Sequence, residues 1–219
     1  MKVWKGNIKG NPSIGLFIFL TEDFGLIGFD VEDKIVKRLE EIFEVPFYKV
    51  SIGGTNLIGV FVTGNSKKLL VPSIIYPHEL KELERITDVI VLETKLNALG
   101  NNIVIGKEAI AVNPRLEQEI KELLAKEFQK PVYDLTIRKH GIIGALIVEF
   151  NRRVLVGNIA KESDIQKIKE IFKAERINVG SVNFGSPFIR SGLVLNSKGY
   201  IIGDKTTGHE IALIEETFY

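Results

Sequence analysis

The side chains most often used in catalysis are few and far apart in this chain. Its 219 residues include no cysteine, and its three histidines are His78, His140 and His209. Without cysteine there is no thiolate nucleophile, no thiolate metal ligand and no disulfide. The histidines lack the short spacing of metal ligands, and the chain has no phosphate-binding or dinucleotide-binding glycine motif. We therefore expect no metal, no cofactor and no enzymatic activity.

One segment resembles a catalytic motif but has a simpler explanation. Asp204-Lys-Thr-Thr-Gly208 contains residues of the aspartyl-phosphate motif Asp-Lys-Thr-Gly-Thr in a different order. Thr207 is followed three residues later by Glu210, which is the pattern of a helix capping box. We expect this segment to begin a helix rather than to carry a phosphoryl group.

Polar side chains gather instead in five short loops, each of which ends in a glycine. We call these the anchor loops: Asn11-Pro-Ser-Ile-Gly15, Thr55-Asn-Leu-Ile-Gly59, Leu96-Asn-Ala-Leu-Gly100, His140-Gly-Ile-Ile-Gly144 and Phe188-Ile-Arg-Ser-Gly192. In or beside them stand side chains suited to hydrogen bonding across a wet protein interface, namely Asn11, Asn56, Asn97, Asn101, His140 and Arg190. Alternatively, the asparagines only turn the chain by hydrogen-bonding their own backbone.

The anchor glycines recur every 41 to 48 residues, a spacing typical of repeat proteins. Each is followed by a short apolar strand, a tight turn, a second strand and an amphipathic helix. The first strands are predicted at 16–20, 60–62, 103–105, 145–148 and 193–195, and the second strands at 25–29, 69–72, 109–112, 154–156 and 200–202. Asn113 before Pro114 predicts the start of the third helix.

The two ends of the chain complete each other. Four helices are followed by a third strand, at 47–51, 89–94, 132–137 and 177–182, but the fifth helix is followed by none. Val3-Trp-Lys5 precedes the first anchor loop, where it can supply the missing strand. We predict an α/β fold, a five-bladed pseudo-fivefold α/β propeller closed by the N-terminal strand. The single domain, 1–219, would comprise repeats at about 1–50, 51–94, 95–137, 138–182 and 183–219.

Composition is that of a globular protein, with 45% hydrophobic residues. No apolar run is long enough to cross a membrane, and the first residues lack the apolar segment of a signal peptide. We expect a cytoplasmic monomer. The formal net charge is only +1, so any RNA contact must be local.

The predicted hairpin turns carry basic residues at equivalent positions, most clearly Lys67, Lys68, Arg152 and Arg153. One interpretation is a patch that faces RNA. The other is a set of solvated hairpin tips whose charges oppose aggregation. We favour the second.

Three segments carry a resemblance to a known family: Ser51-Ile-Gly-Gly-Thr-Asn-Leu-Ile-Gly59, Thr94-Lys-Leu-Asn-Ala-Leu-Gly-Asn101 and Asn196-Ser-Lys-Gly-Tyr-Ile-Ile-Gly-Asp-Lys-Thr-Thr-Gly208. In this order, and over the whole chain, they resemble the archaeal translation initiation factor six family of the pentein superfamily. The absence of a tail beyond the fifth helix favours the archaeal form.

The resemblance implies a factor that binds the large ribosomal subunit and prevents premature association with the small subunit. It also implies assistance in large-subunit biogenesis. The implied partners are ribosomal protein L14 and its neighbours near the sarcin-ricin loop, with local rRNA contact. We expect the anchor loops to form the binding face, with Asn56 and Asn101 side by side. The candidate residues are Asn11, Gly15, Asn56, Gly59, Asn97, Gly100, Asn101, His140 and Arg190.

The alternative function is that of an enzyme or a small-molecule binder using polar residues at the centre of the ring. Some enzymes with the pentein ring attack a guanidinium carbon with a cysteine. The absence of cysteine excludes that reaction here.

Overall fold

The computed structural model describes residues 2–219. These residues form two compact units. Unit 1 comprises the chain up to Leu99 together with Ser191–Asp204. Unit 2 comprises Gly100–Arg190 and Lys205–Tyr219. Each unit is thus assembled from two separate stretches of sequence.

Unit 1 contains three sheets of three strands. The first two are β2 (Ile18–Leu20), β3 (Gly25–Gly28) and β4 (Phe47–Val50), and β5 (Thr63–Gly64), β6 (Lys68–Pro72) and β7 (Asp88–Leu92). The third sheet joins β1 (Lys2–Gly6), β15 (Gly199–Gly203) and β14 (Leu193–Leu195). Its helices are η1 (Ile14–Leu16), α1 (Asp33–Phe43), α2 (Ile58–Phe61) and α3 (Pro77–Glu84).

Unit 2 contains two further sheets of the same kind. They are β8 (Ile103–Ile105), β9 (Ile110–Val112) and β10 (Val132–Asp134), and β11 (Ile147–Phe150), β12 (Arg153–Gly157) and β13 (Arg176–Gly180). The longer helices are α5 (Gln118–Phe128), α7 (Glu162–Phe172) and α9 (Gly208–Phe218), and α6 (Ile143–Leu146) is a single turn. Two more single turns, α4 (Leu99–Asn102) and α8 (Ile189–Gly192), lie where the chain passes from one unit to the other.

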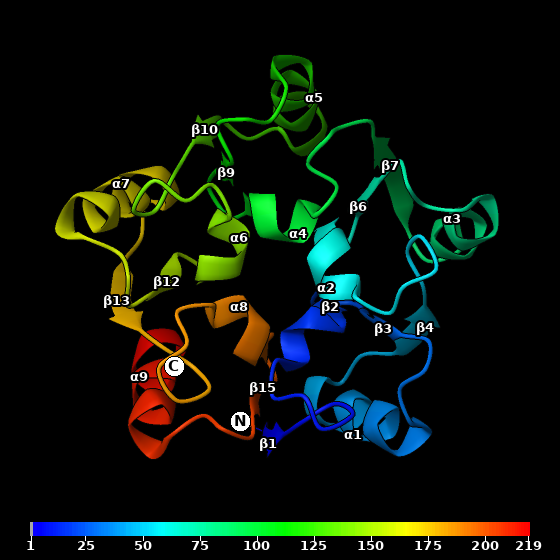
Figure 1. Ribbon diagram of the computed structural model, residues 1–219, viewed down its shortest axis with the longest axis horizontal. Coiled ribbons are helices and arrows are strands. Elements are labelled where there is room, and N and C mark those ends of the chain that lie inside the picture. Colours follow the sequence, from blue (N-terminus) through cyan, green and yellow to red (C-terminus); the bar gives the residue numbers. More distant parts are fainter. Residues whose placement is uncertain (1) are drawn as a thin grey trace. The chain divides into compact units, whose positions relative to one another are not determined.

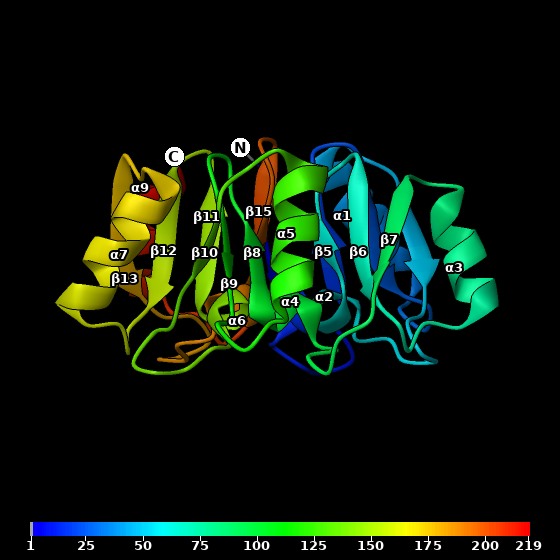
Figure 2. The same cartoon turned by 90° about the horizontal axis from the view of Figure 1, so that it is seen from above.

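Every sheet has an antiparallel hairpin whose second strand also pairs in parallel with a third strand. The second strand is central and apolar, and all four residues of β3 are buried. In unit 2, α6 lies where β11 begins, and the hairpin turn lies at the opposite end of the strand (Figure 2). In unit 1, α2 has the same place before β5. Anchor loop and hairpin turn therefore occupy opposite ends of a sheet, as predicted.

The N-terminal strand completes the fifth sheet. β1 pairs in parallel with β15, with Val3 opposite Tyr200 and Trp4 opposite Ile201. Trp4 also packs against an apolar cluster of unit 1 that includes Ile42 and Val194. The prediction that Val3-Trp-Lys5 supplies the missing strand is confirmed.

The anchor glycines lie in one-turn helices, and only Gly192 directly precedes its strand, β14, as predicted. The first strand predicted at 60–62 is wrong, because α2 occupies Ile58–Phe61 and β5 begins only at Thr63. The reason is close packing between neighbouring turns, such as α2 on η1 in unit 1 (Figure 1). A Cβ on Gly59 would lie 1.9 Å from the carbonyl oxygen of Gly15, and one on Gly144 would lie 2.2 Å from that of Gly100. Only glycine permits this backbone approach.

The third helix also begins later than predicted, since α5 starts at Gln118. Asn113 is instead buried, and its side chain donates to Asn102 Oδ1 at 2.7 Å and accepts from the backbone amide of Arg115 at 3.0 Å. This local turn delays the helix. Among residues 2–219, none of the helices has the length and apolar content of a membrane span.

Candidate functional site: the anchor loops

A tight turn with left-handed backbone precedes four of the anchor loops. Isolated bridges close these turns between Ile8 and Asn11, Ile52 and Thr55, Ile137 and His140, and Val182 and Ser186. Consecutive residues with positive φ lie at the tip of each, namely the pairs Lys9-Gly10, Gly53-Gly54 and Arg138-Lys139 and the three residues Asn183-Phe184-Gly185. These turns were not predicted, although the Gly53-Gly54 pair is a typical signal for one.

Buried carboxylates hold the tips of two of these turns. In unit 1, the side chain of Glu79 is 1% exposed and accepts from the backbone amides of Gly53 at 2.7 Å and Gly54 at 2.9 Å. It also accepts from the Ser51 hydroxyl at 2.5 Å and the Tyr76 amide at 2.9 Å. Burial alone would raise the pKa of Glu79, but these hydrogen bonds outweigh it and lower the pKa.

Glu210 does the same in unit 2. Its carboxylate accepts from the amides of Phe184 at 3.2 Å and Gly185 at 2.8 Å, and from the Ser181 hydroxyl at 2.7 Å. It also closes the capping box predicted with Thr207. Against the opposing effect of burial, these bonds lower the pKa of Glu210 to about 2. A third acid, Asp164, accepts from the Arg138 amide at 3.2 Å.

Each clamping acid is also the third residue of the helix that follows its hairpin. One carboxylate therefore fixes both the helix start and the turn before the anchor loop. An acidic residue at this helix position was the available signal, and it was recognised only for Glu210. The backbone at the tips of these turns is therefore held in place by the carboxylates.

Two anchor-loop asparagines of unit 1 are used inside the protein. The Asn11 side-chain oxygen accepts from the Ser13 amide at 2.8 Å, which is the turn role of the alternative interpretation. Asn56 Nδ2 donates to both carboxylate oxygens of Asp30, and Lys9 Nζ binds the same carboxylate. The bonds from Lys9 and Asn56 lower the pKa of Asp30.

Asn97 and Asn101 retain unused hydrogen-bonding capacity. Among residues 2–219, the side-chain oxygen of Asn97 is the buried side-chain polar atom that has no hydrogen-bond partner. The half-buried side chain of Asn101 makes no hydrogen bond to any residue of the described chain. Unpaired polar groups of this kind favour contact with water or a partner.

The other candidates of unit 2 divide into an exposed residue and a half-buried charge. His140 is exposed at the end of its turn. Arg190 donates to the carbonyl oxygen of Gly100 at 3.3 Å, and burial lowers its pKa to about 10. Arg190 thus supports the backbone of α4. Gly15, Gly59 and Gly100 are buried, and the close approach of Gly59 to the backbone of Gly15 accounts for the glycine at position 59 without a bound partner.

Exposed aromatic residues lie on the fifth anchor loop and its turn, where the sequence analysis selected only Arg190. The side chain of Phe184 is 82% exposed and that of Phe188 is 42% exposed. Phe184 has a φ of 64°, which is rare for a bulky residue, and the Glu210 carboxylate binds its amide. An exposed aromatic side chain on a backbone that is held by hydrogen bonds is typical of a binding contact.

The basic hairpin tips are partly used by the protein itself. Arg152 Nε donates to the carbonyl oxygen of Lys173 at 3.1 Å, and its guanidinium forms an ion pair with Glu175 at 3.1 Å. Arg153 donates to the carbonyl of Phe218. Lys67 is exposed and Lys68 is half-buried. The arginine contacts favour a structural role, and RNA contact by these tips stays a prediction.

Comparison with known structures identifies the fold class. The N-terminal domain of ArgZ, an arginine dihydrolase from cyanobacteria, matches with a TM-score of 0.61 and 12% identity, covering 85% of this chain and 76% of that one. A dimethylarginine dimethylaminohydrolase matches with a TM-score of 0.51 and 12% identity, covering 75% of this chain and 70% of that one. With the five three-stranded sheets, this likeness confirms the α/β propeller of the pentein type.

Comparison of sequences gives closer relatives. Translation initiation factor 6 of Methanosarcina mazei is 33% identical over 96% of this chain and 95% of that protein. Its counterpart in Pyrobaculum aerophilum is 30% identical over 95% of each chain. The model of the eIF-6 family matches residues 3–217. Nearly the whole chain, including the anchor loops and the strand that completes the fifth sheet, thus follows one family pattern, and the protein belongs to the eIF-6 family.

Proposed function

We propose that this protein is a translation initiation factor that binds the large ribosomal subunit and prevents its premature association with the small subunit. The observation that carries the proposal is the match of residues 3–217 to the eIF-6 family, whose archaeal relatives are named translation initiation factor 6. We include a role in large-subunit biogenesis and a cytoplasmic location in the proposal.

The anchor loops are the proposed binding face. Two of the turns that precede them are held by buried carboxylates, so little conformational entropy is lost when those loops bind a partner. Asn97 and Asn101 bring unused hydrogen-bonding groups, and His140 is exposed. We propose ribosomal protein L14 and its neighbours near the sarcin-ricin loop as partners, with local rRNA contact.

This function requires no catalytic step. A factor that blocks subunit joining needs only sufficient affinity and a body that collides with the incoming subunit. Among residues 2–219, no three histidine, aspartate or glutamate side chains come together as metal ligands would. The likeness to arginine-modifying enzymes, at 12% identity, concerns the fold alone.

Cosedimentation tests the proposal. Purified protein is centrifuged with isolated large subunits, isolated small subunits and joined ribosomes. We expect it to travel with large subunits only, and to shift a mixture of subunits away from joined ribosomes as its concentration rises. Equal recovery with small subunits, or binding without any effect on joining, would contradict the proposal.

A further inference from the structure

The outer edge of β1 is an unpaired sheet edge. The sheet order is β1-β15-β14, so within residues 2–219 β1 has a neighbouring strand on one side only. The Lys2 amide donates to the carbonyl of Lys198 at 3.3 Å, which fixes the phase of the parallel ladder. Lys2, Trp4 and Gly6 then direct their backbone groups toward β15. Those of Val3 and Lys5 point away from the sheet, and the Val3 side chain is 46% exposed.

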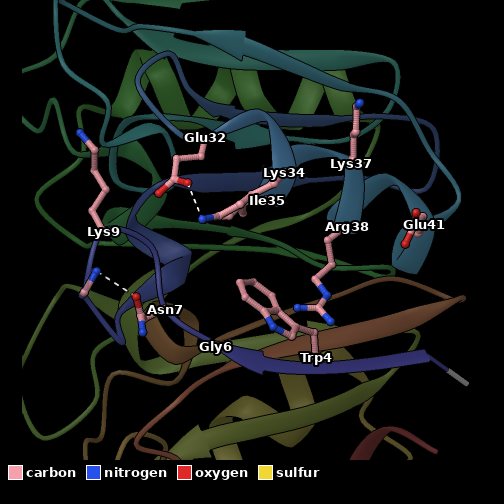
Figure 3. Close-up of a pocket in the computed structure, with 11 residues that line it drawn as sticks. Trp4, Gly6, Asn7, Lys9, Glu32, Lys34, Ile35, Lys37, Arg38 and Glu41 are labelled. Carbon is pink, nitrogen blue, oxygen red and sulfur yellow. Dashed lines mark hydrogen bonds and ion pairs between the residues drawn. The ribbon is translucent and has the colours of Figure 1, made fainter.

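An open groove of about 640 Å³ runs between β1 and α1, within unit 1. Trp4 contributes its indole from β1, and the Arg38 guanidinium from α1 lies 5.6 Å from the ring centre (Figure 3). The indole lies over Gly6, where a Cβ would be 2.1 Å from the ring. The tryptophan therefore lies flat along the strand and lines the groove beside the free edge.

The groove lining has an excess of positive charge, with four basic and two acidic residues. Lys9 binds Asp30, and Lys34 binds Glu32 at 2.7 Å. Lys37 and Arg38, also in the lining, form no salt bridge with any carboxylate of residues 2–219. Of the groove's acidic residues, Glu32 is already paired with Lys34, whereas Glu41 forms no salt bridge within residues 2–219. An anionic partner complements this lining.

A second groove differs from it in charge. Along β10 and α5 in unit 2, a groove of about 340 Å³ contains Lys121, whose ammonium lies 2.6 Å from the carboxylate of Asp134. Its lysine is already neutralised, and the groove is about half as large.

We propose that the β1 edge and its groove bind an extended, acidic segment of a partner protein, which adds to the sheet as a fourth strand beside β1. Backbone groups of Val3 and Lys5 supply the main-chain hydrogen bonds, as in other cases of strand addition. Alternate side chains of the added strand point toward α1, where acidic ones meet Lys37 and Arg38. The groove borders the Lys9-Gly10 turn that precedes the first anchor loop, and binding of a peptide to it requires no ribosome.

Trp4 provides the readout, because it is the one tryptophan of the chain. Its emission is followed while a synthetic peptide of alternating glutamate and valine is added to the full-length protein. We expect a saturable change. The matched control is the same peptide with every backbone amide N-methylated, which keeps the charge but has no amide on either edge to donate to β1. A lysine–valine peptide tests the charge, and oligouridylate tests RNA as the occupant.

Two variants locate the site. Arg38→Glu should weaken peptide binding at least about tenfold, whereas Lys126→Glu, an equal charge change on exposed α5, should not. Val3→Pro removes an outward amide without touching the β1–β15 ladder and should weaken binding similarly. Thermal melting checks that each variant is folded.

The outcomes are distinct. Equal binding of the N-methylated peptide to the wild-type protein would overturn strand addition, even if Val3→Pro failed to fold. Binding of oligouridylate but not of the acidic peptide would overturn the protein partner. No response of Trp4 to any peptide would overturn the site, whatever the result with ribosomal subunits.

Discussion

The side-chain amide of Asn56 donates to both carboxylate oxygens of Asp30, at 3.0 Å each. This pair ties the second anchor loop to the segment that follows β3, and Lys9 from the first turn binds the same carboxylate. Asn56 therefore joins two repeats of unit 1. These contacts explain the asparagine at position 56 by a role in stability, without a bound partner.

Asn56→Asp should destabilise the protein at neutral pH, because it places a second carboxylate against Asp30. We expect a loss of about 1 kcal/mol, or roughly 2–4 °C in melting temperature. The loss should shrink as the pH falls toward about 4, since protonation of either acid relieves the repulsion. Thermal melts at both pH values, with Asn56→Ala as the uncharged control, measure this. A deficit that does not change with pH would exclude repulsion by Asp30.

Asn101→Arg should weaken binding to the large subunit without changing stability. The half-buried Asn101 side chain makes no hydrogen bond within residues 2–219, so its loss costs the folded protein little. At a packed interface an arginine should cost on the order of 2 kcal/mol, or more than tenfold in affinity. Gln166→Arg on exposed α7 is the control with the same added charge. If Asn101→Arg cosediments with large subunits as well as the wild-type protein does, Asn101 is not part of the binding face.

Gly59→Ala should destabilise the protein severely. Its Cβ would lie 1.9 Å from one carbonyl oxygen, that of Gly15, and 2.6 Å from that of Ile18. Because both obstacles are backbone atoms, we expect a loss of about 3 kcal/mol or more in the free energy of unfolding. Gly208→Ala is the control, since a Cβ there meets no atom within 4 Å. Denaturant titration compares the two, and equal midpoints would refute the close-packing explanation for the anchor glycines.

Glu210→Gln should change how the free energy of unfolding depends on pH. The pKa of Glu210 is lowered from 4.5 to about 2 in the folded protein. The contribution of the Glu210 carboxylate to the free energy of unfolding is therefore complete above the pKa of the unfolded state. It disappears as the pH falls from 4.5 to about 2. We expect the variant to lose on the order of 2–3 kcal/mol at neutral pH and to approach the wild type in acid.

The comparison for Glu210 is Glu84→Gln, which alters an exposed glutamate of α3. Unfolding free energies are measured by urea titration across the acid range. If Glu210→Gln and the wild type lose stability in parallel between pH 4.5 and 2, the clamp on the Phe184 turn does not depend on the ionised carboxylate.

The repeat pattern was predictable because it rests on short-range features. β8 and β14 have the predicted bounds, and β1 was located by counting which helix had no third strand. The failures involve packing between repeats. Whether Val60 belongs to a strand or a helix depends on the carbonyl of Gly15, which stands in the preceding repeat. The helix and strand propensities of residues 58–62 do not indicate that contact.

The anchor loops were found by composition, and their chemistry was only partly foreseeable. Asn11 and Asn56 look alike in the sequence, but the first turns its own loop and the second binds Asp30. Arg190 resembles an interface residue until its burial is known. The Glu79 clamp joins residues 25 to 28 positions apart, beyond the reach of local patterns.

The pairing of β1 with β15 also has a consequence for protein synthesis. The first strand to emerge from a ribosome finds its partner only when residues 199–203 have been made. At about 5–20 residues per second, β1 waits roughly 10–40 s with its apolar side chains uncovered. A nascent chain cut short before β15 lacks this sheet altogether, so unit 1 is completed only by a nearly finished translation product.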